Sequence, residues 1–194
     1  NLIEHHGLVD HNVVLRHIEA LLLAKIGNHN PTFNELFVHS KKHIVVSGTN
    51  LQTQECELFS HNTHPSMYVM DALRISISIP FFFNQVVYNG CMYGDGCLIN
   101  MVPHMAFPNV PGNDKICICI NPKEQIQTIG VIEYIQGVIS SMLAGQRPIP
   151  TWLDTIVIEK STQWSVMQPY TTDDVESLFQ VGADAASLHL KKRF

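Results

Sequence analysis

The chain has 194 residues, of which 45% are hydrophobic and 15% charged, and its net charge is -5 with the histidines neutral. This balance is typical of a packed globular protein and excludes a disordered chain. The negative charge argues against nucleic acid as the partner, because a phosphate-binding face needs clustered Lys and Arg. No run comes near the roughly 18 apolar residues of a spanning helix, so we expect no transmembrane segment.

The chain begins with a helical pattern. Apolar residues recur at intervals of three and four from Leu8 to Lys25, and Gly27 then offers a stop. Thr32 precedes Glu35 by three positions, which is a capping-box spacing and predicts the start of a second, short helix.

Two strands should follow these helices. Residues 43–47 (HIVVS) are rich in β-branched side chains, and residues 55–60 (ECELFS) alternate between apolar and polar, so we expect the two strands to pair. Pro65 can open a helix that continues through Ile77 and is ended by Pro80. Beyond it, two short apolar runs flank Asn89-Gly90, which is the strongest hairpin signal in the chain.

The last third alternates between strand and helix patterns. The expected elements are a strand covered on both faces at Lys115–Ile120, a helix at Ile129–Leu143, a strand at Asp154–Ile158 and a helix at Thr172–Leu190 capped by Thr171 or Thr172. Strands that alternate with helices predict an α/β domain with a largely parallel sheet. No linker marks a boundary, so we expect residues 1–194 to form a single domain.

The five cysteines and eleven histidines do not follow a recognised ligand pattern. There is no His-Glu-x-x-His segment and no double cysteine pair at zinc-finger spacing, so we predict no metal and no cofactor. We interpret the histidines, including His11 and His17, as surface residues. The cysteines read as reduced packing residues, with Cys117 and Cys119 on one face of their strand, which suits an intracellular, reducing setting.

Asp95 is the residue with the clearest chemical potential. Gly94 and Gly96 flank it at the end of the second hairpin strand, and glycines of this kind free the backbone for conformations that other residues resist. A carboxylate held among apolar neighbours is a candidate general base. Taken alone, the pair is better explained as an ordinary turn, because most Asp-Gly pairs are turns.

A longer pattern around Asp95 is more specific. The chain carries T-F-x-E-L from Thr32, S-G-T-N-L from Ser47, D-A-L-R-x-S-x-S-I-P from Asp71, then Asp95-Gly96, Leu98, Asn100 and Pro103, and a Gly/Ala-rich segment at 182–186. In this order the segments resemble those of the patatin-like phospholipase family, whose aspartate motif reads D-G-G or D-G-A followed by L-x-x-N-x-P.

The resemblance implies a three-layer α/β/α fold with a mainly parallel central sheet. It also implies a serine esterase that acts on acyl lipids through a Ser–Asp dyad, in which the aspartate takes the serine proton directly. The serine of that family lies in G-x-S-x-G at a strand-to-helix turn, and a glycine-rich loop supplies the oxyanion-hole donors. Asp95 is the one position of this chain to which a catalytic role carries over.

Two departures from the family pattern matter. Cys97 stands where the family has Gly or Ala, and we interpret it as a small packing residue. No G-x-S-x-G occurs in the chain. Three accounts fit this absence: the chain is a piece of a longer protein, a partner chain supplies the serine, or the protein is a degenerate homologue that only binds lipid.

The two enzyme accounts are favoured, because a purely binding relative has no chemical need for Asp95. They predict an acyl lipid substrate, a cytoplasmic protein with transient peripheral membrane contact, and a missing N-terminal segment or partner chain that carries the nucleophile elbow. They also predict apolar surface left uncovered in the chain as it stands.

Overall fold

The computed structural model describes residues 7–122, 130, 134–135, 137–138, 141, 152–160 and 171–193. The chain divides into two compact units. Unit 1 comprises Asn1–Ala106 with Val138–Arg147, and unit 2 comprises Phe107–Gly137 with Pro148–Phe194. The single domain expected for residues 1–194 stays a prediction, and most of the helix expected at Ile129–Leu143 lies outside the described residues.

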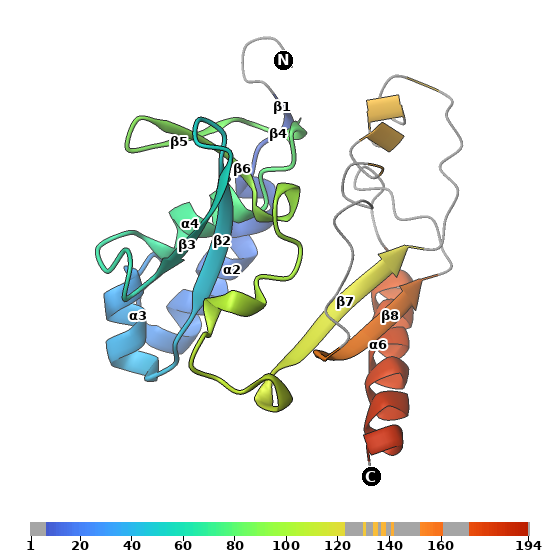
Figure 1. Cartoon of the computed structure of the whole chain (residues 1–194). Coiled ribbons are helices and arrows are strands. Elements are labelled where there is room, and N and C mark those ends of the chain that lie inside the picture. Colours follow the sequence, from blue (N-terminus) through green and yellow to red (C-terminus); the bar gives the residue numbers. More distant parts are fainter. Residues whose placement is uncertain are drawn as a thin grey trace. The chain divides into compact units, whose positions relative to one another are not determined.

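Unit 1 mixes short helices with short strands (Figure 1). Its elements are β1 (Gly7–Val9), α2 (Asn12–Ile26), α3 (Phe33–Ser40), β2 (Val45–Asn50), β3 (Glu55–Ser60), α4 (Val69–Ser76), β4 (Phe81–Phe83), β5 (Val86–Tyr88), β6 (Cys91–Asp95) and the 3-10 turns η1 (Gly96–Leu98) and η2 (His104–Ala106).

Local sequence signals explain several element boundaries. The capping box predicted at Thr32 is confirmed, since Glu35 N–H donates to the Thr32 hydroxyl and Thr32 N–H to the Glu35 carboxylate. Gly27 ends α2 in the left-handed region at φ 72°. Asn89 and Gly90 both have positive φ, 49° and 78°, which is the geometry of the tight hairpin turn that joins β5 to β6.

Tertiary pairing moves two predicted boundaries. The first helix begins at Asn12 rather than Leu8, because residues 7–9 pair in parallel with β4. The helix expected from Pro65 begins at Val69. The segment before it stays extended because it pairs with the residues around Thr32: Phe33 N–H donates to the Met67 carbonyl, and Thr32 bridges Tyr68.

The largest sheet has the order β3-β2-β6-β5, and all three of its pairings are antiparallel. Short loops join β2 to β3 and β5 to β6, and such loops can connect only antiparallel neighbours. The predicted pairing of the first two strands is therefore confirmed. Parallel pairing is found in the two-stranded sheets β1-β4 and β7-β8. The mixed α/β character is observed, and the largest sheet that the structure describes is antiparallel. The three-layer arrangement around a mainly parallel sheet stays a prediction.

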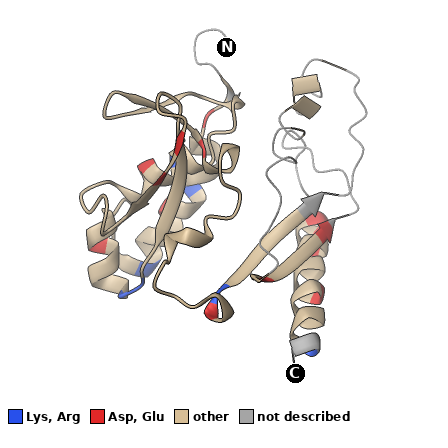
Figure 2. Cartoon of the chain, in the orientation of Figure 1, with Lys and Arg blue, Asp and Glu red and all other residues tan. Residues whose placement is uncertain are grey.

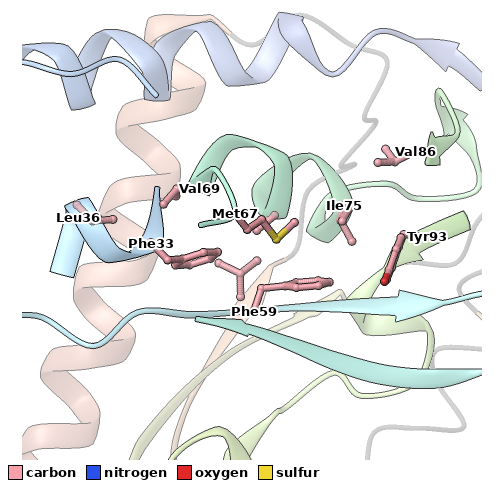
Figure 3. Packing of buried hydrophobic residues seen from close by; sticks show 10 residues of the cluster. Phe33, Leu36, Phe59, Met67, Val69, Ile75, Val86 and Tyr93 are labelled. Atoms are coloured by element: carbon pink, nitrogen blue, oxygen red, sulfur yellow. The ribbon is translucent and has the colours of Figure 1, made fainter. Parts of the chain in front are cut away.

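The core of unit 1 lies between this sheet and the helices α3 and α4. Figure 3 shows Phe33 and Leu36 from α3 facing Met67, Ile75 and Phe59, with Tyr93 of β6 at the sheet side. Phe59 and Ile75 have no exposed surface. A Cβ at Gly48 would lie 2.3 Å from Ile75 Cγ2, so the absence of a side chain on β2 lets α4 approach the sheet closely.

Unit 2 is smaller, and the elements that the structure bounds in it are η3 (Gly112–Asp114), the parallel pair β7 (Ile116–Pro122) and β8 (Asp154–Lys160), and α6 (Thr172–Arg193). Thr171 caps α6 through reciprocal hydrogen bonds with Asp174, as one of the two alternatives predicted. A groove of about 380 Å³ lies between β8 and α6, with Ile156 and Leu188 among its lining residues.

The strand β7 is not covered on both faces, contrary to the sequence prediction. Ile116, Ile118 and Ile120 remain 55%, 65% and 48% exposed. The strand has the sequence ICICINP, without Lys, Arg, Asp or Glu, and its described part is accordingly tan in Figure 2. Among the elements of unit 2 that the structure describes, α6 packs on β8. The alternate face carries Cys117 and Cys119 with their sulfur atoms 3.2 Å apart, which confirms that they share a face.

All five cysteines are free. In the part of the chain that the structure describes, no helix is long and apolar enough to cross a membrane. Nor does any group of three or more His, Cys, Asp or Glu side chains in that part come together in a way that could hold a metal ion.

Candidate active site

Asp95 lies at the last position of β6, where the strand turns into η1, and is only 8% exposed. β6 runs beside β2, with Asp95 directly opposite Gly48. Two other segments of the family pattern lie next to it: the S-G-T-N residues 47–50 are in β2, and the D-A-L-R residues 71–74 are in α4, which packs on β2.

Hydrogen bonds fix Asp95 on three sides. Its N–H donates to the Ser78 carbonyl at 2.9 Å, and its own carbonyl accepts the Thr49 hydroxyl at 2.8 Å. The carboxylate oxygen Oδ1 accepts the N–H of Cys97 at 2.7 Å. Thr49 and Ser78 are themselves 3% and 4% exposed. Since backbone and side chain are both held, the carboxylate keeps one orientation without a substrate present.

Gly94 and Gly96 are required for steric reasons, and not for the unusual backbone conformation that the sequence suggested. Among the glycines that the structure describes, Gly27 and Gly90 have positive φ, and neither flanking glycine of Asp95 is left-handed. Space is what they provide. A Cβ at Gly96 would lie 2.4 Å from the Ser47 hydroxyl oxygen, and one at Gly94 would lie 2.8 Å from Leu98 Cδ1. The strand-to-turn corner is close-packed rather than conformationally unusual.

Burial raises the pKa of Asp95 above its ordinary value, and the hydrogen bonds from Cys97 offset part of this rise. A carboxylate with a raised pKa is a stronger base than a solvated one. The environment therefore suits a group that takes a proton from a reacting hydroxyl.

Cys97 does not have the properties of a nucleophile. Burial, together with the neighbouring Asp95 carboxylate, raises the pKa of its thiol to about 12. Reactive cysteines instead have lowered pKa values, because the thiolate is the attacking species. At neutral pH the Cys97 side chain is a small neutral thiol beside the carboxylate.

His11 and Ser78 form a second buried polar pair that the sequence analysis did not find. His11 was interpreted as a surface residue, but it is 3% exposed. Its Nε2 lies 3.0 Å from the Ser78 hydroxyl oxygen, and its ring stacks on Phe83 at 5.0 Å. Sequence gives no signal for this contact, because 67 residues separate the two partners.

A family model described as "Patatin-like phospholipase" matches residues 1–108, more than half of the chain. The chain therefore belongs to the patatin-like phospholipase family, as its motifs predicted. The match covers all of the region around Asp95 and ends two residues after unit 1 gives way to unit 2. The Gly/Ala-rich segment at 182–186 lies outside it.

Two viral proteins are similar to the chain. One, named "Probable lipid hydrolase 463L", from Invertebrate iridescent virus 6, is 29% identical over 97 residues, which are 50% of this chain and 33% of that protein. The other, an uncharacterized protein of Acanthamoeba polyphaga mimivirus, is 33% identical over 93 residues, which are 48% of this chain and 30% of that protein. These matches span about a third of the length of either relative.

Proposed function

We propose that the protein is a lipid acyl hydrolase, a phospholipase A-type carboxylic ester hydrolase, in which Asp95 is the general base of a Ser–Asp dyad. The observation that carries this proposal is the environment of Asp95: a buried carboxylate, held on three sides, with a raised pKa. Family membership and the name of the iridescent virus relative support hydrolysis of lipids as the reaction class.

In the proposed reaction, the Asp95 carboxylate accepts the proton of a serine hydroxyl as its oxygen attacks the ester carbonyl. Collapse of the tetrahedral intermediate breaks the bond to the leaving alcohol, which takes the proton held by Asp95, and leaves an acyl-serine. Water then attacks the acyl-serine while Asp95 accepts its proton, and Asp95 returns that proton to the serine oxygen as the fatty acid is released. No histidine relay is needed, because the carboxylate acts on the hydroxyl directly.

The serine must come from outside these 194 residues, since the sequence holds no G-x-S-x-G. In this proposal the remaining segment or partner chain brings the nucleophile elbow and the oxyanion-hole donors to Asp95. It also completes a three-layer fold with a mainly parallel sheet. The substrate is an acyl lipid, reached in the cytoplasm by transient contact with a membrane surface.

The same absence of a serine motif favours one alternative: a homologue that has kept the lipid site and lost the chemistry. Such a protein would bind acyl lipid with or without Asp95. The two functions therefore separate on whether Asp95 is needed for turnover.

The test is hydrolysis of a short-chain p-nitrophenyl ester and of a phospholipid by the 194-residue chain and by the full-length product of its gene. Each is compared with its Asp95→Ala and Asp95→Asn variants, and with Asp114→Asn as a matched change of an exposed aspartate in η3. We expect an active full-length protein, a silent 194-residue chain, a loss of about a hundredfold or more for either Asp95 variant, and normal rates for Asp114→Asn.

Asp95→Asn also separates lost chemistry from lost folding. The amide oxygen can still accept the N–H of Cys97, and the variant no longer buries a charge whose pKa the fold raises. Its melting temperature should therefore equal or exceed that of the wild type. A full-length protein that binds lipid and hydrolyses neither ester would overturn the enzyme proposal.

A further inference from the structure

We propose that His11 is a positioning residue for Asp95: it binds the Ser78 hydroxyl and so holds the Ser78 carbonyl where the Asp95 N–H donates to it. The inference rests on the proposed role of Asp95 for its catalytic consequence, but not for its geometry. It links the N-cap residue of α2 to the corner where β6 ends.

The contact chain is short and buried throughout. His11 Nε2 lies 3.0 Å from Ser78 Oγ, and the carbonyl of Ser78 accepts the Asp95 N–H at 2.9 Å. The three residues are 3%, 4% and 8% exposed. Buried polar contacts of this kind are expensive to leave unpaired, so each member strongly determines the position of the next.

Ser78 needs such support because it lies outside regular structure. α4 has ended at Ser76, and β4 does not begin until Phe81. The pairing of β5 with β6 ends at Tyr93. The N–H of Asp95 therefore donates to the Ser78 carbonyl instead of to a neighbouring strand. The segment around Ser78 thus provides the acceptor that a strand of the sheet would ordinarily provide.

Proton counting assigns the direction of the His11 bond. Ser78 has one hydroxyl hydrogen, and it is donated to the Arg74 carbonyl at 2.6 Å. The Ser78 oxygen must therefore accept from His11, which requires the tautomer with hydrogen on Nε2. A histidine that acts as a base toward a serine needs a bare nitrogen at that point. His11 and Ser78 are thus not a nucleophile–base pair.

The surroundings keep His11 neutral and oriented. Burial and the nearby Arg74 guanidinium lower its pKa to about 4, against the opposing effect of the Asp10 carboxylate. The ring stacks on Phe83 with an interplanar angle of 21°. Although His11 occupies the N-cap position of α2, its side chain makes no capping hydrogen bond there. Its hydrogen-bonding capacity is directed to Ser78 instead.

The experiment uses three single variants of the full chain, the double variant His11→Phe/Ser78→Ala and one control. His11→Phe keeps a ring beside Phe83 but has no donor, and His11→Gln places an amide N–H near the position of Nε2. Ser78→Ala removes the acceptor while its carbonyl stays. His17→Phe changes an exposed histidine of the same helix. Two quantities are measured for each: the Asp95 carboxyl titration by ¹³C NMR, and kcat, KM and their pH profile in the active full-length protein.

We expect His11→Phe and Ser78→Ala to lower the Asp95 pKa toward its ordinary value, because a loosened corner admits water. They should reduce kcat about tenfold with KM within about twofold. His11→Gln should restore most of the Asp95 pKa shift and of kcat. The double variant His11→Phe/Ser78→Ala should lose no more of either than the single variants, because both changes remove the same contact. His17→Phe should match the wild type.

A folded His11→Phe or Ser78→Ala protein with a wild-type Asp95 titration overturns the inference. If His11→Phe does not fold, Ser78→Ala decides, since it removes a single oxygen atom. Should the full-length protein show no esterase activity at all, the proposed function fails on its own, and the Asp95 titration still tests the role of His11.

Discussion

Unit 1 and unit 2 contain the same kinds of residue, but they bury them very differently. In unit 1, Phe33 and Phe59 are 2% and 0% exposed and pack with two helices and a sheet. In unit 2, Phe179 of α6 is 78% exposed, and Ile118 of β7 is 65% exposed. The family model, which matches residues 1–108, covers the whole of the Asn1–Ala106 part of unit 1 and only two residues of unit 2.

The difference shows that apolar pattern and burial are separate properties. A strand such as β7 reads as fully buried in sequence, yet α6 covers only its neighbour β8 among the elements that the structure describes in unit 2. The rigid placement that Asp95 needs comes from the dense packing of unit 1. Three experiments test this contrast, from the largest expected effect to the smallest.

Replacing one phenylalanine in each unit tests whether the two units differ in how deeply they bury apolar side chains. Phe59→Ala leaves a cavity beneath β3 and α4 and should reduce the free energy of unfolding by about 3–5 kcal/mol. Phe179→Ala removes an exposed ring and should change it by less than about 0.5 kcal/mol. Urea unfolding followed by circular dichroism measures both. Similar losses for the two variants would mean that Phe179 is buried in the protein in solution.

Acid should weaken unit 1 through His11. Its folded pKa of about 4 lies below the ordinary 6.5, so the unfolded chain binds more protons between these values, and stability falls as the pH drops through that window. The full loss is about 3 kcal/mol, because one pKa unit corresponds to ~1.36 kcal/mol.

Unfolding at pH 7.0, 5.5 and 4.5 measures this effect, with His11→Gln as the comparison because glutamine does not titrate. The difference between the two proteins should grow as the pH falls. An identical pH dependence would show that His11 is not buried neutral. The two tryptophans, Trp152 and Trp164, both fall in the sequence of unit 2, so their fluorescence should respond to this titration less than circular dichroism does.

Helix caps should stabilise the two units by similar amounts, in contrast to the two phenylalanines. Thr32 caps α3 and Thr171 caps α6, each through reciprocal bonds with an acidic side chain three residues later. Thr32→Ala and Thr171→Ala should each reduce the free energy of unfolding by about 1 kcal/mol. Thr32→Ala could reduce the free energy of unfolding while Thr171→Ala leaves it unchanged. That result would mean that the start of α6 depends on packing from outside the described elements of unit 2.

Features that depend on a few neighbouring residues were predictable. The capping box at Thr32, the hairpin at Asn89-Gly90 and the end of α2 at Gly27 each follow from side-chain chemistry or from the freedom of glycine at positive φ. The motif around Asp95 could be located because its residues are contiguous along one hairpin strand and the turn after it.

Features that join distant segments were not predictable. The parallel pairing of β1 with β4 shortened the first helix, and the contacts of Thr32 with the segment before α4 delayed that helix to Val69. The close approach of Ser47 to Gly96 gave the flanking glycines of Asp95 a steric role in place of a conformational one. The burial of His11 belongs to the same group.

The sequence by itself determined the caps, the turns, most strands and helices, the family and the candidate base Asp95. Each of these depends on short-range patterns that persist whatever the rest of the chain does. Only the tertiary structure decided that the largest sheet is antiparallel and that Ser78 and Thr49 hold Asp95. It also decided that His11 supports Ser78 from the start of α2. The physical reason is that burial and hydrogen bonding between segments 17 to 67 residues apart arise from packing, which no local pattern encodes.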